Sequence, residues 1–117
     1  EFIKSDAADL GIPMMVITNS ETACGAELIA VCLRDYQKAL IVGENTAGKG
    51  ISQKIYEFSD GSALILSTSR FYPALSENFD LKGIAPDIPV SIQDDINIYY
   101  VSAEEDPQLQ AAIKELS

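Results

Sequence analysis

The sequence predicts a single α/β domain, and three observations support this class. A continuous apolar run at Pro13–Thr18 is typical of a strand that is buried on both faces. A second run at Ala39–Gly43 has the same character, and the residues between the two carry apolar side chains at helical spacing. A strand, a helix and a strand joined by short loops form a parallel unit with a right-handed crossover.

The helix between these strands is predicted over Thr22–Gln37, after polar residues that can cap its start. Arg34, Asp35 and Lys38 are left for solvent on its polar face. Cys24 and Cys32 lie on the same helix, where a rise of about 1.5 Å per residue separates them by about 12 Å. The two cysteines therefore cannot form a disulfide without unwinding the helix.

The second half of the chain begins with a predicted antiparallel hairpin. Gln53–Phe58 alternates between polar and apolar residues, Ser59–Ser62 has turn composition, and Ala63–Tyr72 returns as a long strand.

A polar loop follows at Pro73–Lys82, and Gly83–Val90 is an extended segment interrupted by prolines. The last element is a helix ending at Leu116, which Asp106 opens and which has Pro107 in its first turn.

Composition excludes several classes of partner and site. The net charge of −10, from 18 acidic and 8 basic residues, argues against binding to nucleic acid or to an anionic membrane surface. Because the chain has no histidine, it contains neither a histidine-based triad nor the usual zinc spacings. The acidic runs Asp94-Asp95 and Glu104-Glu105-Asp106 could suggest a cation site, but a solvated loop and a helix start explain them more simply. We expect no metal and no other cofactor.

Cys24 and Lys49 are the candidate catalytic residues. A thiol in the first turn of a helix is exposed to unpaired amide donors and to the positive end of the helix dipole, which favour a thiolate. Lys49, framed by Gly48 and Gly50, can serve as its base, and the amide of Gly25 can stabilise an oxyanion. The alternatives are that Cys24 is a small buried hydrophobe and that Lys49 is an exposed turn residue.

A phosphate-binding loop is a further alternative for the glycine turn. Gly43, Gly48 and Lys49 have the spacing of the first seven positions of such a loop after a strand. The eighth position should be a Ser or Thr that binds Mg²⁺ and opens a helix, whereas here it is Gly50 and a strand follows. Nucleotide binding is therefore disfavoured.

Linked motifs across the chain resemble the carboxyl-terminal processing peptidases, or tail-specific proteases. In that family a small-residue run ending in Glu opens a helix, a strand ends in Val-Gly-Glu, and Thr-Phe-Gly-Lys-Gly follows with a Gln shortly after. The matching segments here are Thr22–Glu27, Asp35-Tyr36, Ile41–Glu44, Thr46–Gly50 with Gln53, Phe58–Ala63, Gly83–Asp87 and Asp106–Leu109. Their order and spacing agree with the family pattern.

The resemblance implies a fold and a set of roles. The fold would be the crotonase-like and Clp-protease-like core of repeated ββα units, with residues 1–117 as the carboxyl-terminal part of the peptidase domain. Family members are serine peptidases with a Ser/Lys dyad. By position Lys49 would be the general base, Gln53 would orient it, Gly25 would supply one oxyanion amide, and the nucleophilic serine falls on Cys24.

The chain departs from the family in two respects. First, Cys24 stands where the family has a serine. A thiol beside a lysine could ionise to a thiolate–ammonium pair and attack directly. However, the longer bonds of sulfur could displace the attacking atom, and about 1 Å of misplacement lowers the reaction rate on the order of 10²-fold. The alternative function is thus a silent relative that binds peptide tails.

Second, the family's PDZ domain and its upstream Asp-Leu-Arg-x-Asn-x-Gly-Gly segment do not occur in these residues. We therefore expect the PDZ domain of the same parent chain and a protein tail as partners. Unpaired strand edges such as Met14–Thr18 favour self-association, so a homo-oligomer is a further expectation. The resemblance implies an extracytoplasmic location, in a bacterial envelope or a plastid lumen.

Overall fold

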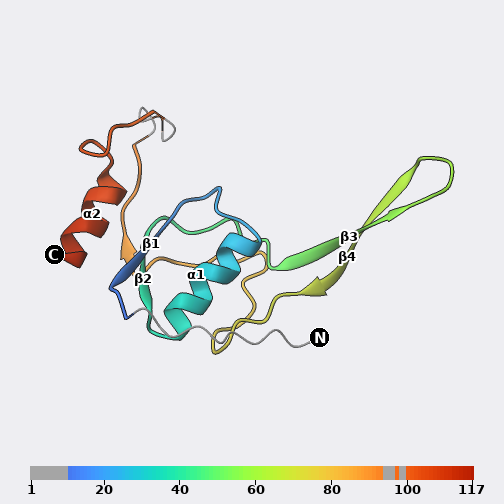
Figure 1. Cartoon of the computed structure of the whole chain (residues 1–117), viewed down its shortest axis with the longest axis horizontal. Coiled ribbons are helices and arrows are strands. Elements are labelled where there is room, and N and C mark those ends of the chain that lie inside the picture. The colour runs from blue at the N-terminus through green and yellow to red at the C-terminus, as the bar shows by residue number, and fades with distance from the viewer. Residues whose placement is uncertain (1–10, 94–96, 98–99) are drawn as a thin grey trace.

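The structure is a computed structural model that describes residues 11–93, 97 and 100–117. Its elements are β1 (Met14–Thr18), α1 (Gly25–Asp35), β2 (Ala39–Gly43), β3 (Ile51–Glu57), β4 (Ala63–Arg70), β5 (Ile88–Pro89) and α2 (Pro107–Leu116) (Figure 1). The predicted order of strands and helices is confirmed. Asp94 and Asp95, which were expected in a solvated loop, lie outside the described residues.

The predicted parallel strand, helix and strand unit is confirmed. β1 and β2 pair in parallel from Met14 opposite Ala39 to Thr18 opposite Gly43, and β5 pairs with the other edge of β2. Helix α1 is shorter than the predicted Thr22–Gln37. It begins after Cys24 and ends before Tyr36, because the backbone turns to positive φ at Cys24 and again at Gln37.

The core lies between α1 and the central strand β2. Ala30, Val31 and Ile41 form it together with Phe79 and Ile84, which come from the predicted polar loop and extended segment. Burial on both faces is confirmed for Ile41 and Val42 of β2, which are fully buried, but not for Leu40, which is 48% exposed.

The same prediction was wrong for β1, where Ile17 is 40% exposed. β1 is an edge strand of the described sheet and has only β2 beside it, so it has less cover.

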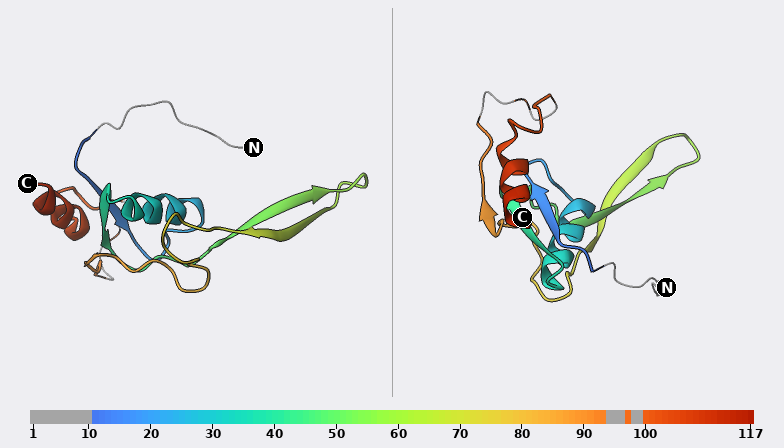
Figure 2. Two further views of the ribbon diagram at one scale, coloured as in Figure 1. Left: turned by 90° about the horizontal axis from the view of Figure 1, so that it is seen from below. Right: turned by 60° about the vertical axis from the view of Figure 1, so that its left-hand side comes forward.

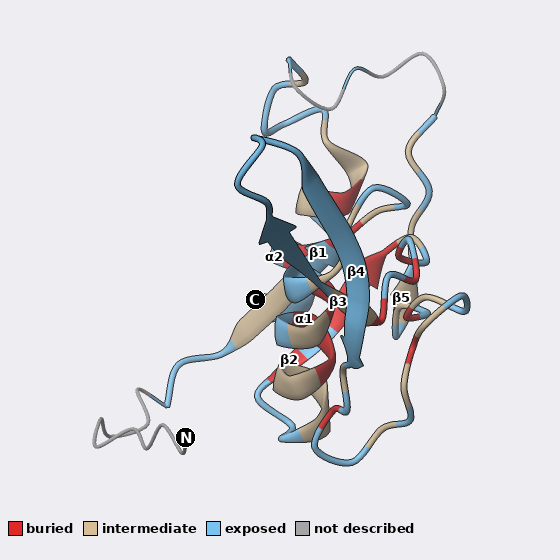
Figure 3. Cartoon of the chain, turned by 90° about the vertical axis from the view of Figure 1, so that its right-hand side faces the viewer, coloured by how far each residue is buried: buried red, intermediate tan, exposed pale blue. Residues whose placement is uncertain are grey.

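Strands β3 and β4 form the predicted antiparallel hairpin, which projects away from the parallel sheet (Figure 2). β4 ends at Arg70 rather than at Tyr72. All the side chains of β4 are exposed, as are those of β3 from Gln53 onward (Figure 3). The exposed apolar residues include Ile55, Tyr56, Leu64, Ile65 and Leu66. A β-bulge at Ser52 and Gln53 interrupts the ladder near the base of the hairpin.

Helix α2 starts as its sequence indicates. Asp106 is the N-cap, and its carboxylate accepts hydrogen bonds from the amides of Gln108 and Leu109, with Pro107 in the first turn. The buried side chain of Gln108 donates to the Val90 carbonyl, which fixes α2 to the segment after β5. Among the described residues, no helix is long and apolar enough to cross a membrane.

The carboxylate of Asp35 ties the end of α1 to the loop after β4. It accepts hydrogen bonds from the amides of Leu75 and Ser76 and from the Ser76 hydroxyl. Partial burial raises the pKa of Asp35, but the Ser76 hydroxyl, these amides and the charge of Arg34 together lower it below its ordinary value.

Because the pKa of Asp35 is lower in the folded than in the unfolded protein, its ionised carboxylate stabilises the fold at pH values above 3.8. This stabilisation is lost as the pH falls through the pKa of the folded state. We expect Asp35→Asn to lower the free energy of unfolding at pH 7 by about 1 kcal/mol, a value limited by solvent screening. In the variant, the free energy of unfolding measured in urea should also fall less steeply as the pH is lowered below 3.8. Glu104→Gln, at an exposed carboxylate, is the matched control. An unchanged acid limb in Asp35→Asn would contradict this role.

Candidate active site

Cys24 sits on a sharp turn between β1 and α1. Its backbone has φ 59° and ψ −118°, a region that residues with a side chain rarely occupy. Such strain costs on the order of 1–3 kcal/mol and is found mainly at functional sites, including the turn that presents a nucleophile at the start of a helix. The thiol is free and partly exposed, and its Sγ lies 3.9 Å from the Ile51 carbonyl oxygen at the start of β3.

Cys32, the other cysteine, lies in the interior of α1 and packs against the hydrophobic core. It is also a free thiol, in agreement with the prediction that the two cysteines do not pair. The small-hydrophobe interpretation therefore fits Cys32, whereas Cys24 differs from it in backbone conformation and in its surroundings.

Gly25, the residue after the thiol, has open space where a side chain would be. A Cβ built on Gly25 would meet nothing within 4 Å, so packing does not require a glycine at this position. Within the described part of the chain, the Gly25 amide donates no hydrogen bond. An unpaired amide next to an open space is what an oxyanion formed at Cys24 would need.

Glu27 connects the turn at Cys24 to the loop of residues 44–50 between β2 and β3, which contains Lys49 and is called the lysine loop below. The side chain is fully buried, and each carboxylate oxygen accepts two hydrogen bonds. Oε1 accepts from the Thr46 hydroxyl and from the Gly48 amide at 2.7 Å. Oε2 accepts from the amides of Cys24 and Lys49, both at 2.8 Å. Because the backbone nitrogens of Cys24 and Lys49 each lie 2.8 Å from the same oxygen, they are separated by no more than twice 2.8 Å.

Glu27 belongs to a sequence motif of the chain, but its role is not apparent from that motif. A signal was present, because Glu at the third helical position after an N-cap is half of a capping box. Cys24 in the place of the usual Ser or Thr concealed this signal. The contacts with Thr46, Gly48 and Lys49 were not visible, since they join residues 19 to 22 positions apart.

The lysine loop is held by close backbone packing. Gly48 has φ 77°, and a Cβ there would lie 2.7 Å from the Gly83 amide nitrogen. A Cβ on Gly50 would lie 2.5 Å from the Asp80 nitrogen, so both glycines are required by the approach of residues 80–83. The amides of Gly48 and Lys49 point at Glu27. They are therefore not available to a phosphate, which adds a structural reason against the phosphate-loop alternative.

The side chains of Lys49 and Gln53 are both exposed. Within the described residues, the Lys49 ammonium has no hydrogen bond or ion pair, and no hydrogen bond joins it to Gln53. Gln53 lies in β3 opposite Ser67. The structure thus brings the backbones of Cys24 and Lys49 together through Glu27, whereas no hydrogen bond links Gln53 to Lys49 in the described part of the chain.

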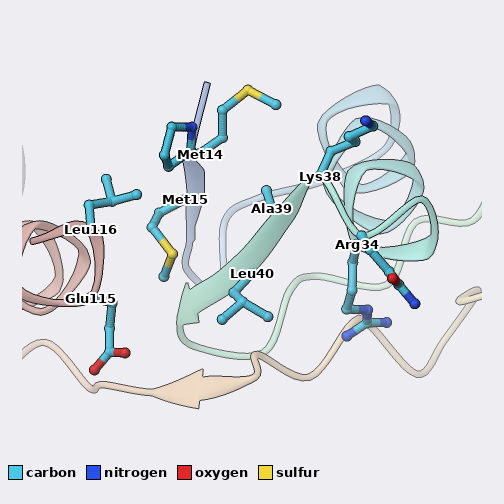
Figure 4. A pocket seen from close by; sticks show the side chains of 10 residues that line it. Met14, Met15, Arg34, Lys38, Ala39, Leu40, Glu115 and Leu116 are labelled. Carbon is cyan, nitrogen blue, oxygen red and sulfur yellow. The ribbon is translucent and has the colours of Figure 1, made fainter. Parts of the chain in front are cut away.

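A pocket lies at the amino-terminal ends of β1 and β2, whereas Cys24 and Lys49 follow the carboxyl-terminal ends of these strands (Figure 4). It is lined by Met14 and Met15 from β1, by Ala39 and Leu40 from β2, and by Arg34, Lys38 and Leu116 among others. It contains no thiol or hydroxyl nucleophile. Among the described residues there is also no cluster of Cys, Asp or Glu that could hold a metal ion.

The chain matches the sequence model of peptidase family S41 over residues 3–90, which is most of its length. It belongs to peptidase family S41. Similar relatives include the carboxyl-terminal-processing protease of Picosynechococcus, 35% identical over 86% of this chain and 24% of the relative. Carboxyl-terminal-processing peptidase 2, chloroplastic, of Arabidopsis thaliana is 37% identical over 74% of this chain and 17% of the relative.

A solved structure of a photosystem II D1 C-terminal processing protease has a similar fold. It aligns with a TM-score of 0.65 and 32% identity over 71% of this chain and 22% of that protein. The predicted α/β class and the family resemblance are both confirmed. The chain spans about a quarter or less of the length of these relatives, all of which are named as proteases or peptidases.

Proposed function

We propose that this protein is a peptidase that processes extended carboxyl-terminal tails of proteins by acyl transfer through Cys24. The observation that carries the proposal is the buried carboxylate of Glu27, which accepts from the amides of both Cys24 and Lys49. This contact holds a thiol on a strained helix start beside a lysine loop, as a paired nucleophile and base require. The names of the relatives support the choice of substrate.

In the proposed reaction, the Lys49 amine takes the proton from the Cys24 thiol. The thiolate sulfur attacks the carbonyl carbon of the scissile bond, and the C=O electron pair moves to oxygen, where the Gly25 amide donates to it. Collapse breaks the C–N bond, and the leaving amine takes the proton from Lys49. Water then hydrolyses the thioester on Cys24. Gln53 orients the Lys49 ammonium when a tail is bound.

Parts of the working site come from outside residues 1–117 in this proposal. A PDZ domain of the same parent protein captures the tail, and a glycine of an upstream segment supplies the second oxyanion amide. The relatives include a chloroplastic enzyme and bacterial ones, which supports an extracytoplasmic or plastid location. The exposed edges of β1 and of the hairpin favour a homo-oligomer.

A binding protein without peptidase activity is the second candidate. The observations that favour it are the cysteine at the nucleophile position and the exposed Lys49 side chain, which has no partner among the described residues. In this case the same surface would hold a tail without cutting it.

A covalent trapping experiment separates the two candidates. The full-length protein is mixed with an unstructured peptide that has an apolar carboxyl-terminal tail, quenched in acid, and analysed by mass spectrometry beside Cys24→Ser and Cys24→Ala. We expect cleavage by the natural protein and an acyl adduct on the Cys24 peptide, with neither in Cys24→Ala. Activity only in Cys24→Ser would identify a silenced serine-type site. Tail binding without cleavage in all three would overturn the peptidase proposal in favour of the binding protein.

A further inference from the structure

The β3–β4 hairpin exposes apolar side chains on both of its faces. In the ladder, Tyr56 lies opposite Leu64 on one face and Ile55 lies opposite Ile65 on the other. These four side chains are 39–60% exposed. The hairpin also projects away from the parallel sheet (Figure 2). Because a two-stranded sheet is only marginally stable in water, a further strand at one of its edges would stabilise it.

The two strands of the hairpin differ in charge. β3 carries Lys54 and Glu57, and charged side chains, lysine above all, oppose the addition of another strand. β4 has no charged residue from Ala63 to Ser69, where its side chains are aliphatic or carry a hydroxyl. Within the described residues, the backbone of Ala63 to Ser67 makes no hydrogen bond outside the ladder with β3. The β4 edge is therefore the edge that is open to pairing.

The turn determines which backbone groups of β4 point outward. The Phe58 amide donates to the Ser62 carbonyl, so these two residues form a hydrogen-bonded pair at the end of the ladder. Such pairs alternate with non-hydrogen-bonded pairs along antiparallel strands. Counting from this pair, the even-numbered residues of β4 up to 66 bond to β3. The N–H and C=O groups of Ala63, Ile65 and Ser67 therefore point away from β3.

These outward groups are arranged symmetrically about Ile65. The regular ladder of β4 runs from Ala63 to Ser67, because Thr68 is the extra residue of the bulge. In antiparallel self-pairing about Ile65, this residue bonds to its own counterpart in a second copy. Ala63 then bonds to Ser67 of the second copy, so all the outward groups of the segment are paired. The two leucines within the segment also lie opposite each other, with apolar against apolar side chains.

Charge complementarity supports the same register. The turn of each hairpin lies near the base of the other, which brings Asp60 in the turn towards Arg70 of the second copy. Within the described residues, the Arg70 guanidinium has no ion pair and no hydrogen bond. The Ser62 hydroxyl and amide donate to the Asp60 carboxylate and lower its pKa, so this carboxylate is ionised at neutral pH.

We propose that a second copy of this protein pairs antiparallel with the β4 edge about a two-fold axis at Ile65, forming a four-stranded sheet with the two β4 strands at its centre. This dimer gives the homo-oligomer of the proposed function a defined surface, and it rests on that expectation but not on peptidase activity. Arg70 pairs with Ile51, whose carbonyl oxygen lies 3.9 Å from the Cys24 Sγ. The dimer thus places the turn of the second copy at the end of the hairpin nearest the nucleophile.

Sedimentation equilibrium of the full-length protein at increasing concentration tests the dimer. Ile65→Lys places two ammonium groups opposite each other at the two-fold axis, so we expect the dissociation constant to rise by about 10-fold or more. Ile55→Lys is the matched control, because Ile55 has nearly the same exposure on the same face but lies in β3, away from the new strand pair. Its dissociation constant should stay within about threefold of the natural value.

A cross-link provides a second measurement that does not add a charge. The Cα atoms of a hydrogen-bonded antiparallel pair are about 5.5 Å apart, within the range of a disulfide. In a Cys24→Ser and Cys32→Ser background, Ile65→Cys should therefore form a covalent dimer on mild oxidation. Ile55→Cys should not, because three strand spacings of about 4.8 Å separate its two copies in the four-stranded sheet.

A concentration-dependent dimer that Ile65→Lys weakens and Ile65→Cys captures supports the pairing. A monomer at all concentrations without a cross-link would overturn it, as expected if a strand elsewhere in the parent chain covers β4. A dimer that Ile65→Lys leaves unchanged and that both cysteine variants capture equally would place the interface elsewhere and would also overturn it. None of these measurements involves cleavage, so failure of the dimer leaves the peptidase proposal intact.

Discussion

Replacing Lys49 with alanine in the full-length protein is expected to lower kcat/KM by about 10²–10⁴-fold, which is the range for loss of a general acid–base group. The substitution removes the amine that takes the thiol proton and returns it to the leaving group. It leaves the Lys49 amide in place, so the hydrogen bond to Glu27 is retained. The free energy of unfolding should therefore change little, and the loss should appear in kcat rather than in tail binding.

Lys114→Ala is the control for this experiment, because Lys114 is an exposed lysine in the last turn of α2. Its kcat/KM should stay within about twofold of the natural value, as expected for a surface change far from the site. Full activity in Lys49→Ala would show that Cys24 ionises without this base. The paired nucleophile and base would then be wrong even if Cys24 is acylated.

Replacing Glu27 with glutamine is expected to have a large effect on both stability and activity. The amide keeps the volume of the carboxylate, but its NH₂ group would face two N–H or O–H donors instead of accepting from them. Leaving buried donors unpaired costs about 1–3 kcal/mol each, so with two such donors the free energy of unfolding should fall by about 2–6 kcal/mol. The Cys24 turn and the Lys49 loop would also separate, and kcat should fall by about 10²-fold.

The measurements are urea unfolding and steady-state cleavage at a temperature where circular dichroism shows the variant to be folded. Glu57→Gln, the same change at an exposed position in β3, is the control. A purely structural role for Glu27 would reduce the folded fraction and leave the kcat of the folded protein unchanged. A lower kcat with an unchanged KM supports a positioning role, and loss of stability alone would contradict it.

The order of elements followed from local sequence. The apolar runs of β1 and β2, the helical spacing of α1, the turn between β3 and β4 and the Asp106-Pro107 start of α2 are each encoded within a few neighbouring residues. The motifs that contain Cys24 and Lys49 were equally local, and they led to the correct family. Periodicity, capping and turn preferences act over this range, which is why they could be used without a structure.

Burial was predicted less well because it depends on neighbours in space. β1 has the apolar composition of a fully covered strand, yet Ile17 is exposed at the edge of the described sheet. Phe79 and Ile84, in segments assigned as loop and extended chain, are instead part of the core. Composition indicates which side chains can be buried, and the packing of distant segments determines which of them are.

The connections within the site also came only from the folded chain. The motifs indicated a thiol, a lysine and a possible oxyanion amide. The fold added the positive φ of Cys24, the four hydrogen bonds of Glu27 and the pairing of Arg70 opposite Ile51. Three of the four Glu27 hydrogen bonds and the Ile51–Arg70 pairing join residues 19 to 22 positions apart. No local preference specifies these contacts, which arise when α1, the lysine loop and the hairpin pack together.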